Sequence, residues 1–147
     1  MISVRRASTL DAPDMARLLN AIIERGGTTA LTKPVTGGDM IDRMAAGAER
    51  AAWHVAENDG AILGFQWIGP YETLPPEACD IATFVQIGRT GLGIGSALFT
   101  ATAKAAKELG YVWINATIRA DNEGGLIYYQ SRGFRDWHHD HGVRLEN

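Results

Sequence analysis

The order of the expected secondary-structure elements predicts an α/β (α+β) domain with a mixed, mostly antiparallel, twisted sheet. An Asn-Asp-Gly turn at residues 58–60 separates two runs with the pattern of antiparallel strands. Later in the chain strands alternate with helices, which is typical of parallel pairing. The chain has 147 residues, 46% hydrophobic and 21% charged, so one domain of this kind can bury a core. We expect about six or seven strands, with about four helices over both faces.

The first part of the chain predicts a strand over residues 2–7 and then two helices. Asp11 and Pro13 are typical of a helix start and Gly26 of a helix end, and the apolar residues between them repeat at helical spacing. These residues are Met15, Leu18, Leu19, Ile22 and Ile23. A weaker helix is expected from about Asp39. Its inward-facing residues are expected to be Met40, Ile41, Met44 and Ala48.

The remaining elements follow from turn residues and apolar runs. Residues 53–57 and 62–68 form the expected hairpin, and residues 79–85 have the pattern of a buried strand. After them we expect a glycine-rich loop, a helix over 93–109, a strand over 111–118, a helix over 122–131, a strand over 134–137 and a last short strand over 143–145.

Composition and charge restrict the classes of function. The formal net charge is −3, whereas proteins that bind nucleic acid broadly carry a basic excess. The single cysteine, Cys79, cannot form an internal disulfide. No apolar run approaches the roughly 20 residues that cross a bilayer, and the N-terminus lacks the apolar segment of a signal peptide. We therefore expect a cytoplasmic protein without a nucleic-acid or membrane partner.

The most informative stretch joins a strand to a helix through glycines: Val85-Gln86-Ile87-Gly88-Arg89-Thr90-Gly91-Leu92-Gly93-Ile94-Gly95-Ser96. Glycines let the backbone approach a ligand closely, and the first N–H groups of a helix favour a bound anion. Arg89 adds a positive charge. The pattern favours a phosphate or diphosphate site, and a ligand-free glycine turn is the alternative.

Three known phosphate-binding loops are compared with this stretch. A nucleotide P-loop needs a Lys after its glycines, and none follows here. A dinucleotide-binding loop needs a third glycine where Ser96 stands. The run from Thr90 to Gly95 instead resembles the Q/R-x-x-G-x-G/A loop of the GNAT superfamily of N-acetyltransferases, with Thr90 in place of Gln or Arg. In that family the loop holds the pyrophosphate of acetyl-CoA.

A second segment resembles the same family. Residues 122–134, N-E-G-G-L-I-Y-Y-Q-S-R-G-F, are similar to the family's N-x-x-A-x-x-x-Y-x-x-x-G-F, with Gly125 in place of Ala. One expected helix and one expected strand separate the two motifs. The resemblance implies a single GNAT-like N-acetyltransferase domain over residues 1–147. Several shorter matches resemble the phosphinothricin-acetyltransferase group and imply a small amine as acceptor: Thr28-Thr29-Ala30, Trp53, Gly69-Pro70 and residues 91–96.

The resemblance implies acetyl-CoA as co-substrate and no metal. The residues it implies for binding acetyl-CoA are Val85, Ile87, Arg89, Thr90, Gly91, Gly93, Ile94, Gly95, Ser96 and Asn122. The backbone of Val85 and Ile87 would face the pantetheine arm if the sheet splays between their strand and residues 111–118. Asn122 is also a good helix cap, and both roles are compatible.

The resemblance also implies a catalytic pair. An amine with a pKa near ~10.4 must lose a proton before it attacks a thioester, and a carboxylate can accept that proton directly or through water. Asp80 stands where the phosphinothricin-like group has a Glu base, and its shorter side chain favours a bridging water. Tyr129 stands at the family's acid position, where it would protonate the leaving thiolate. The alternatives are a solvated carboxylate for Asp80 and an aromatic anchor for Tyr129, and Tyr128 is expected to pack.

These features predict direct acetyl transfer from acetyl-CoA to a primary amine of a small molecule, such as an amino acid or a xenobiotic. A non-catalytic acyl-CoA sensor or interaction module of the same fold, and a protein or peptide N-acetyltransferase, are the alternatives. His138, His139 and His141 stand alone near the C-terminus and do not predict a metal site. A homodimer is compatible with the short C-terminus, since a partner would cover an exposed strand edge.

Overall fold

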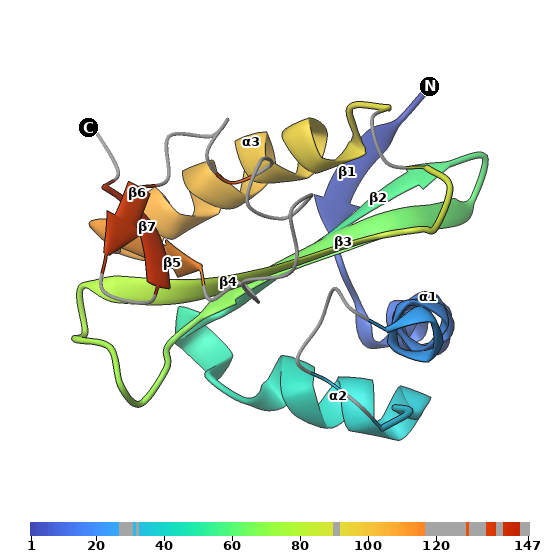
Figure 1. Cartoon of the computed structure of the whole chain (residues 1–147), viewed down its shortest axis with the longest axis horizontal. Coiled ribbons are helices and arrows are strands. Elements are labelled where there is room, and N and C mark those ends of the chain that lie inside the picture. The colour runs from blue at the N-terminus through green and yellow to red at the C-terminus, as the bar shows by residue number, and fades with distance from the viewer. Residues whose placement is uncertain are drawn as a thin grey trace.

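The computed structural model of the chain describes residues 1–26, 31, 33–89, 92–116, 129, 135–137 and 140–144. In this part of the chain seven strands form one sheet in the order β1-β2-β3-β4-β5-β7-β6 (Figure 1). The strands are β1 (Ser3–Arg6), β2 (Ala52–Asn58), β3 (Ala61–Gly69), β4 (Ala78–Val85), β5 (Trp113–Ala116), β6 (Arg135–Trp137) and β7 (Asp140–Arg144). Only β4 and β5 pair in parallel, so the predicted mixed, mostly antiparallel sheet is confirmed.

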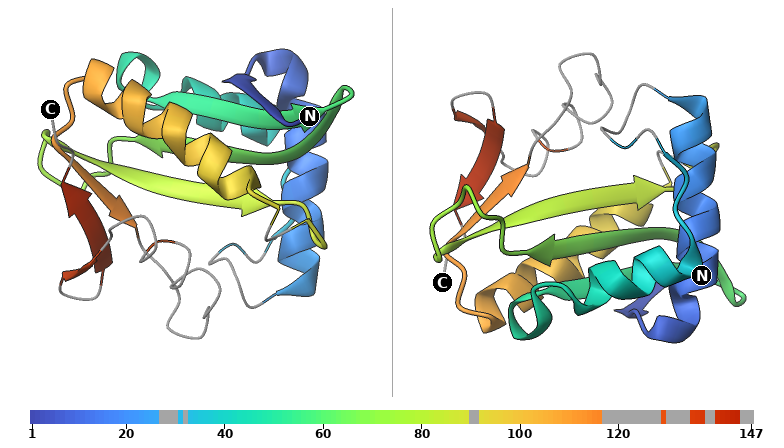
Figure 2. Two further views of the ribbon diagram at one scale, coloured as in Figure 1. Left: turned by 90° about the horizontal axis from the view of Figure 1, so that it is seen from above. Right: turned by 90° about the horizontal axis from the view of Figure 1, so that it is seen from below.

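The α-helices cover both faces of the sheet, as expected. Helices α1 (Ala12–Arg25) and α2 (Gly37–Ala45) lie on one face and α3 (Ile94–Glu108) crosses the other (Figures 1 and 2). Two 3₁₀ turns, η1 (Thr9–Asp11) and η2 (Ala48–Arg50), precede α1 and β2. Of the helix expected over 122–131, the structure describes Tyr129 alone. No helix in the described ranges has the length and apolar character needed to cross a membrane.

The N-termini of α1 and α2 differ in detail from the sequence prediction. Ser8 caps the preceding η1 turn, while the Asp11 carboxylate accepts a bond from Arg5 at 2.8 Å and makes no capping bond to α1. Asp11 is thus the N-cap residue of α1, as predicted, but its side chain makes no capping bond because Arg5 on β1 and the Ser8 amide engage its oxygens. Helix α2 begins earlier than expected, with Thr36 as its cap. Ile41 is 42% exposed rather than inward, because the neighbouring Met40 takes the buried position.

A glycine on β3 sets how closely α3 packs on the sheet. A Cβ added at Gly64 would lie 2.9 Å from the Phe84 carbonyl oxygen and 3.0 Å from Cγ2 of Ile94. Ile94 and Leu98 are fully buried there, in a cluster with Ala56 and Leu63. The missing side chain thus lets the first turn of α3 lie directly on the sheet, beside the end of β4.

Among the described residues, the parallel pair β4–β5 is registered over four residue pairs. The registered pairs run from Ala78↔Trp113 to Ile81↔Ala116, while β4 continues to Val85 along β3. Both views of Figure 2 show β4 and β5 diverging toward their C-terminal ends. The splay between these two strands, which the resemblance implied, is therefore present. In the described register, residues 82–85 of β4 pair with β3 and not with β5, and we call this divergence of the two strands the gap.

Candidate active site

The chain turns from β4 into α3 at a glycine in the left-handed region. Gly93 is the N-cap of α3, with φ 81°, and the first helical hydrogen bond is donated by the Ala97 amide to the Gly93 carbonyl at 3.0 Å. The amides of residues 94–96 therefore point out of the helix N-terminus. Within the described residues, no side chain caps this end of α3 and none in its first turn is acidic. The positive end of the helix dipole at this terminus favours an anion.

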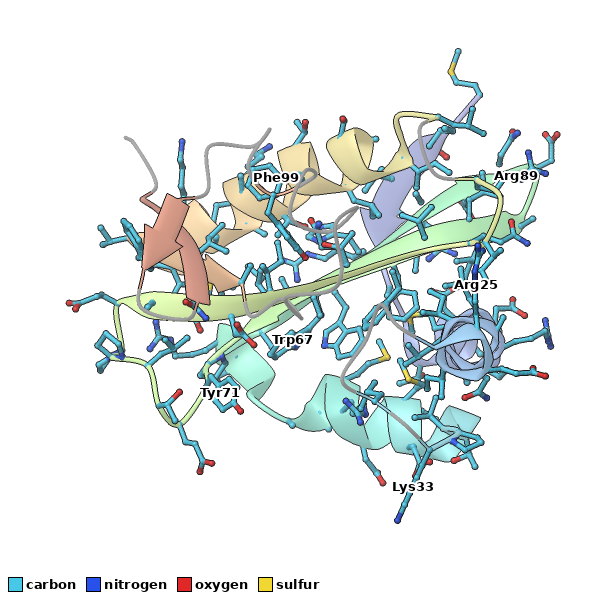
Figure 3. The ribbon with its side chains drawn as sticks, viewed as in Figure 1. Arg25, Lys33, Trp67, Tyr71, Arg89 and Phe99 are labelled. Carbon is cyan, nitrogen blue, oxygen red and sulfur yellow. The ribbon has the colours of Figure 1, made fainter. Side chains whose placement is uncertain are left out.

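The turn that leads to this helix start is open and carries a cation. The Arg89 amide donates to the Gln86 carbonyl at 2.9 Å, and Gly88 has φ 86°. A Cβ added at Gly88 or Gly93 would meet nothing within 4 Å, so space is available on both sides of the turn. Arg89 is exposed on this turn (Figure 3). Backbone amides, a helix N-terminus and a guanidinium together suit a diphosphate.

The strand before the turn presents backbone groups to the gap between β4 and β5. The Gln86 amide donates to the Leu63 carbonyl on β3 at 2.8 Å. Successive residues of a strand direct their N–H and C=O groups to opposite sides, so those of Val85 point toward the β5 side. Ile87 lies in the following turn and is 40% exposed. Val85 is thus oriented as expected for contact with an extended ligand arm.

The predicted acid, Tyr129, lies on the α3 face of the sheet. It is 7% exposed and packs in the cluster that contains Ile81 and Ala105. Its hydroxyl lies 2.8 Å from Oγ1 of Thr83 on β4. Thr83 Oγ1 in turn accepts a hydrogen bond from Nε2 of Gln66 on β3 at 2.7 Å. The tyrosine is therefore both an aromatic anchor and a member of a polar chain.

The predicted base, Asp80, lies on the other face of β4. It is half-buried, opposite Gly69 of β3 and Asn115 of β5. Nδ2 of Asn115, which is 1% exposed, donates to Oδ1 of Asp80 at 3.2 Å. A hydrogen-bond donor of this kind favours the charged carboxylate. Asp80 lies where β4 and β5 are still paired, so it stands at the closed end of the gap.

Asp80 and Thr83 are three residues apart on β4, so their side chains lie on opposite faces of the sheet. The Cα atoms of residues three apart in a strand are separated by about 10 Å. The two predicted catalytic side chains therefore flank the gap from opposite faces, with Tyr129 nearer its open end.

Aromatic side chains lie beside Asp80 on its face of the sheet. A Cβ added at Gly69 would lie 2.6 Å from Cζ2 of Trp67, so the indole covers this glycine, which pairs with Asp80. The Trp53 ring is 6.1 Å from that of Trp67 and 6.2 Å from that of Phe65. Figure 3 shows Trp67 on the α2 side of the sheet and Phe99 on the α3 side. We call Trp53 and Trp67 the aromatic wall.

Several predicted site residues lie outside the described part of the chain: Thr90, Gly91 and Asn122, together with His138 and His139. Ile94 is 1% exposed, so only its backbone can face a ligand. Ser96 is exposed in the first turn of α3, next to the half-buried Gly95. The described ranges contain no group of three His, Cys, Asp or Glu side chains that could hold a metal.

Cys79 is fully buried in the core, and burial raises the pKa of its thiol to about 12. Its interpretation as a core residue is therefore confirmed. A thiol with such a pKa stays protonated at neutral pH and is a poor nucleophile.

Sequence reasoning did not single out Gln66, Thr83 or Asn115. Each is a polar residue inside an apolar strand run, and that pattern was the available signal. Buried polar side chains need hydrogen-bond partners. Here Asn115 bonds to Asp80, Thr83 contacts Tyr129, and Gln66 bonds to Thr83.

Comparison with known proteins agrees with this arrangement. Residues 49–136 match the family described as acetyltransferase (GNAT) domain. The chain is 24% identical over 135 residues to the phosphinothricin N-acetyltransferase of Streptomyces viridochromogenes, covering 90% of this chain and 74% of that protein.

Solved structures share the fold. A GNAT superfamily phosphinothricin acetyltransferase from Sinorhizobium meliloti, in complex with AcCoA, superposes with a TM-score of 0.88 at 17% identity, over 98% of this chain and 88% of that one. A ribosomal-protein-alanine N-acetyltransferase from Brucella melitensis gives a TM-score of 0.82 at 21% identity, over 92% and 85%. Proteins named for a small acceptor and for a protein acceptor thus share this architecture, so the fold alone does not identify the acceptor.

Proposed function

We propose that this chain, which belongs to the GNAT acetyltransferase family, transfers the acetyl group of acetyl-CoA directly to a primary amine of a small molecule. One observation carries the proposal: β4 diverges from β5 and leads into the N-terminus of α3, with Asp80 and Tyr129 on the two faces of β4 (Figure 2). A binding module needs the loop and the gap, whereas only catalysis needs both side chains.

The residues around the gap fit acetyl-CoA. The amides of the first turn of α3 and the Arg89 guanidinium would hold the diphosphate, and the backbone of Val85 and Ile87 would line the pantetheine arm. Thr90, Gly91 and Asn122 complete the proposed set. When bound, acetyl-CoA supplies an activated acetyl group and a thiolate leaving group.

Asp80 serves as the proton acceptor in this proposal. The acceptor amine arrives protonated and must lose a proton before it attacks the thioester. Asn115 keeps the Asp80 carboxylate oriented by its bond of 3.2 Å. Since Asp80 stands at the closed end of the gap, a water molecule passes the proton between the amine and the carboxylate.

Tyr129 serves as the proton donor to the leaving sulfur. Its hydroxyl is held next to β4 by Thr83, in the part of the strand that β5 does not cover in the described register. The lack of a reactive thiol supports direct transfer: Cys79 is the only cysteine, it is buried, and its pKa is about 12. A Cys79 acetyl-enzyme is therefore disfavoured.

The aromatic wall supports a small acceptor. Trp53 and Trp67 lie on the same face of the sheet as Asp80, and the Trp67 indole covers Gly69, the register partner of Asp80. The similarity to a phosphinothricin N-acetyltransferase over 90% of this chain points the same way. A cytoplasmic location and a homodimer stay predictions of the sequence, and light scattering in solution tests the second.

The experiment is release of free thiol from acetyl-CoA in the presence of a panel of small amines and peptides. We expect turnover with at least one small amine and none with peptides. Turnover only with peptides would favour a protein acetyltransferase. Binding of CoA in a thermal-shift assay without turnover across the panel would favour a non-catalytic acyl-CoA sensor. A rise in melting temperature with NAD or ATP, together with no rise with CoA, would contradict the proposed CoA site.

A further inference from the structure

Three polar side chains form a hydrogen-bonded chain through the apolar α3 face of the sheet. Gln66 on β3 donates from Nε2 to Thr83 Oγ1 at 2.7 Å, and Thr83 Oγ1 lies 2.8 Å from the Tyr129 hydroxyl. Gln66 is 0% exposed and Tyr129 is 7% exposed. Residues 66 and 83 are also register partners across β3 and β4, so the two strands fix their separation. Polar groups in such a position are expected to serve more than packing.

The donors in this chain determine its direction. The Gln66 amide nitrogen can only donate, so it occupies one lone pair of the Thr83 oxygen. Thr83 has a single hydroxyl proton, as does Tyr129. If Tyr129 gives its proton away, its oxygen can only accept, so the Thr83 hydroxyl must be the donor in the contact between them. The order Gln66→Thr83→Tyr129 is therefore the only one compatible with a deprotonated tyrosine in this contact.

We propose that Thr83 and Gln66 are positioning residues that make Tyr129 an acid. The Thr83 hydroxyl donates to the Tyr129 oxygen as the tyrosine proton passes to the leaving sulfur, while Gln66 holds Thr83 in the donating orientation. This inference rests on the proposed function, because it assumes that Tyr129 protonates that sulfur.

The proton and electron changes balance in this scheme. The amine nitrogen forms the new C–N bond, the C–S bond breaks, and its electron pair stays on sulfur. The protonated acceptor first gives one proton through water to Asp80, which releases it to solvent, and the nitrogen gives up a second proton by the same route as the amide forms. The proton of Tyr129 passes to the sulfur. The phenolate that remains accepts the Thr83 hydrogen bond and regains a proton from solvent after the thiol leaves. A bond that strengthens as charge develops on the phenol oxygen lowers the barrier to the transfer.

Variants at position 83 test the inference in the full-length protein. Thr83→Val removes the hydroxyl at nearly constant shape, and we expect kcat to fall about tenfold or more while the KM for acetyl-CoA changes less than twofold. The alkaline limb of the pH–rate profile should move to higher pH, because the phenol loses a donor that favours its ionised form. Thr83→Ser keeps the hydroxyl and should restore both. Gln66→Met should lower kcat by a smaller factor.

Thr102 on α3 provides a matched control. It is also a fully buried threonine, and its hydroxyl has no hydrogen-bond partner among the residues described. Thr102→Val should leave kcat and the pH–rate profile unchanged. An equal fall in kcat in both valine variants would assign the effect to core packing and overturn the inference.

A measurement without turnover separates this inference from the proposed function. The chain has four tyrosines, and labelling their Cζ carbons with ¹³C lets NMR follow each phenol titration, with Tyr129→Phe assigning the signal. We expect the Tyr129 midpoint to rise by about one pH unit in Thr83→Val and to stay in Thr83→Ser. An unchanged midpoint in Thr83→Val would overturn the positioning role even in an active enzyme.

If no amine supports turnover but the midpoint shifts, the proposed function fails and the hydrogen-bonded chain stands. If Thr83→Val does not fold, the Gln66→Met titration decides, with a raised midpoint supporting the inference and an unchanged one overturning it.

Discussion

The two faces of β4 are built differently. On the α3 face, Thr83 and Tyr129 lie among buried apolar residues, and Gly64 lets α3 approach without a gap. On the opposite face, Asp80 lies beside the half-buried Trp67. The shape of the α3 face depends mainly on the backbone and on close packing. The shape of the opposite face depends on a few individual side chains. Membership of a family therefore predicts the face that would hold acetyl-CoA better than the face that would hold the acceptor.

The largest effect is expected from Asp80→Asn. This variant keeps the size of the side chain and removes its basicity, so we expect kcat to fall about 100-fold or more at neutral pH. The KM for acetyl-CoA should change little, because Asp80 lies away from the α3 N-terminus. Steady-state kinetics measures both, with the exposed Glu77→Gln as control. Parallel loss of CoA binding would mean that the two faces of β4 are not separate.

Tyr129→Phe should have the next largest effect. It removes the acid and leaves the aromatic ring packed in its cluster, so we expect kcat to fall about 10- to 100-fold with the Kd for CoA nearly intact. Calorimetric titration with CoA and steady-state kinetics check the two parts. A kcat equal to that of the parent would leave Tyr129 as an anchor alone and remove the basis for a role of Thr83.

Trp67→Ala tests the acceptor face. Loss of the indole beside Asp80 should raise the KM for the amine about tenfold and leave the KM for acetyl-CoA within twofold. The comparison variant is Phe99→Leu on the α3 face, which should not change the KM for the amine. A rise in the KM for acetyl-CoA alone would contradict the division between the two faces.

Arg89→Gln tests the loop at the start of α3. We expect a three- to tenfold rise in the KM for acetyl-CoA that shrinks at high ionic strength, because an exposed cation is screened by salt. Lys107→Gln removes a charge from the last turn of the same helix and serves as control. An equal and salt-independent effect in both variants would argue against a diphosphate beside Arg89.

The smallest expected effect concerns the pH dependence of stability through His54. It tests how tightly α3 covers its face of the sheet. His54 is 6% exposed, and burial together with the nearby Arg6 lowers its pKa from 6.5 to about 4. The folded state thus holds His54 neutral. The stability this provides is present above pH 6.5 and is lost as the pH falls toward 4.

The loss should be on the order of 2 kcal/mol in the free energy of unfolding. Urea titrations between pH 7 and pH 4.5 measure it. His54→Gln should flatten this part of the profile. An equally steep profile in that variant would assign the acid sensitivity to other groups.

Much of the framework was predictable from local patterns. The Asp-Gly turn at residues 59–60 and the alternating runs around it predicted the hairpin, and the glycines before residue 94 predicted the strand-to-helix turn. The capping of α2 by Thr36 and the exposure of Ile41 were missed, because the start of a helix determines which residues face the core.

The site was only partly predictable. Asp80 was selected by its position in a motif, but its bond to Asn115 depends on parallel pairing of two strands 35 residues apart in sequence. The contact between Thr83 and Tyr129 spans 46 residues, and no local pattern contains it. Gly64 was also missed, since its importance appears only when Ile94 is placed 3.0 Å from its absent Cβ. Local sequence patterns do not show which residues far apart in the chain become contact partners.

The burial of Cys79 has a practical consequence. It is the sole sulfhydryl of the chain, it is 0% exposed, and it is protonated at the pH of ordinary assays. Thiol-reactive dyes should therefore count product without a background from the native catalyst. A cysteine introduced at an exposed position would be the single site for attaching a fluorophore that reports on ligand binding.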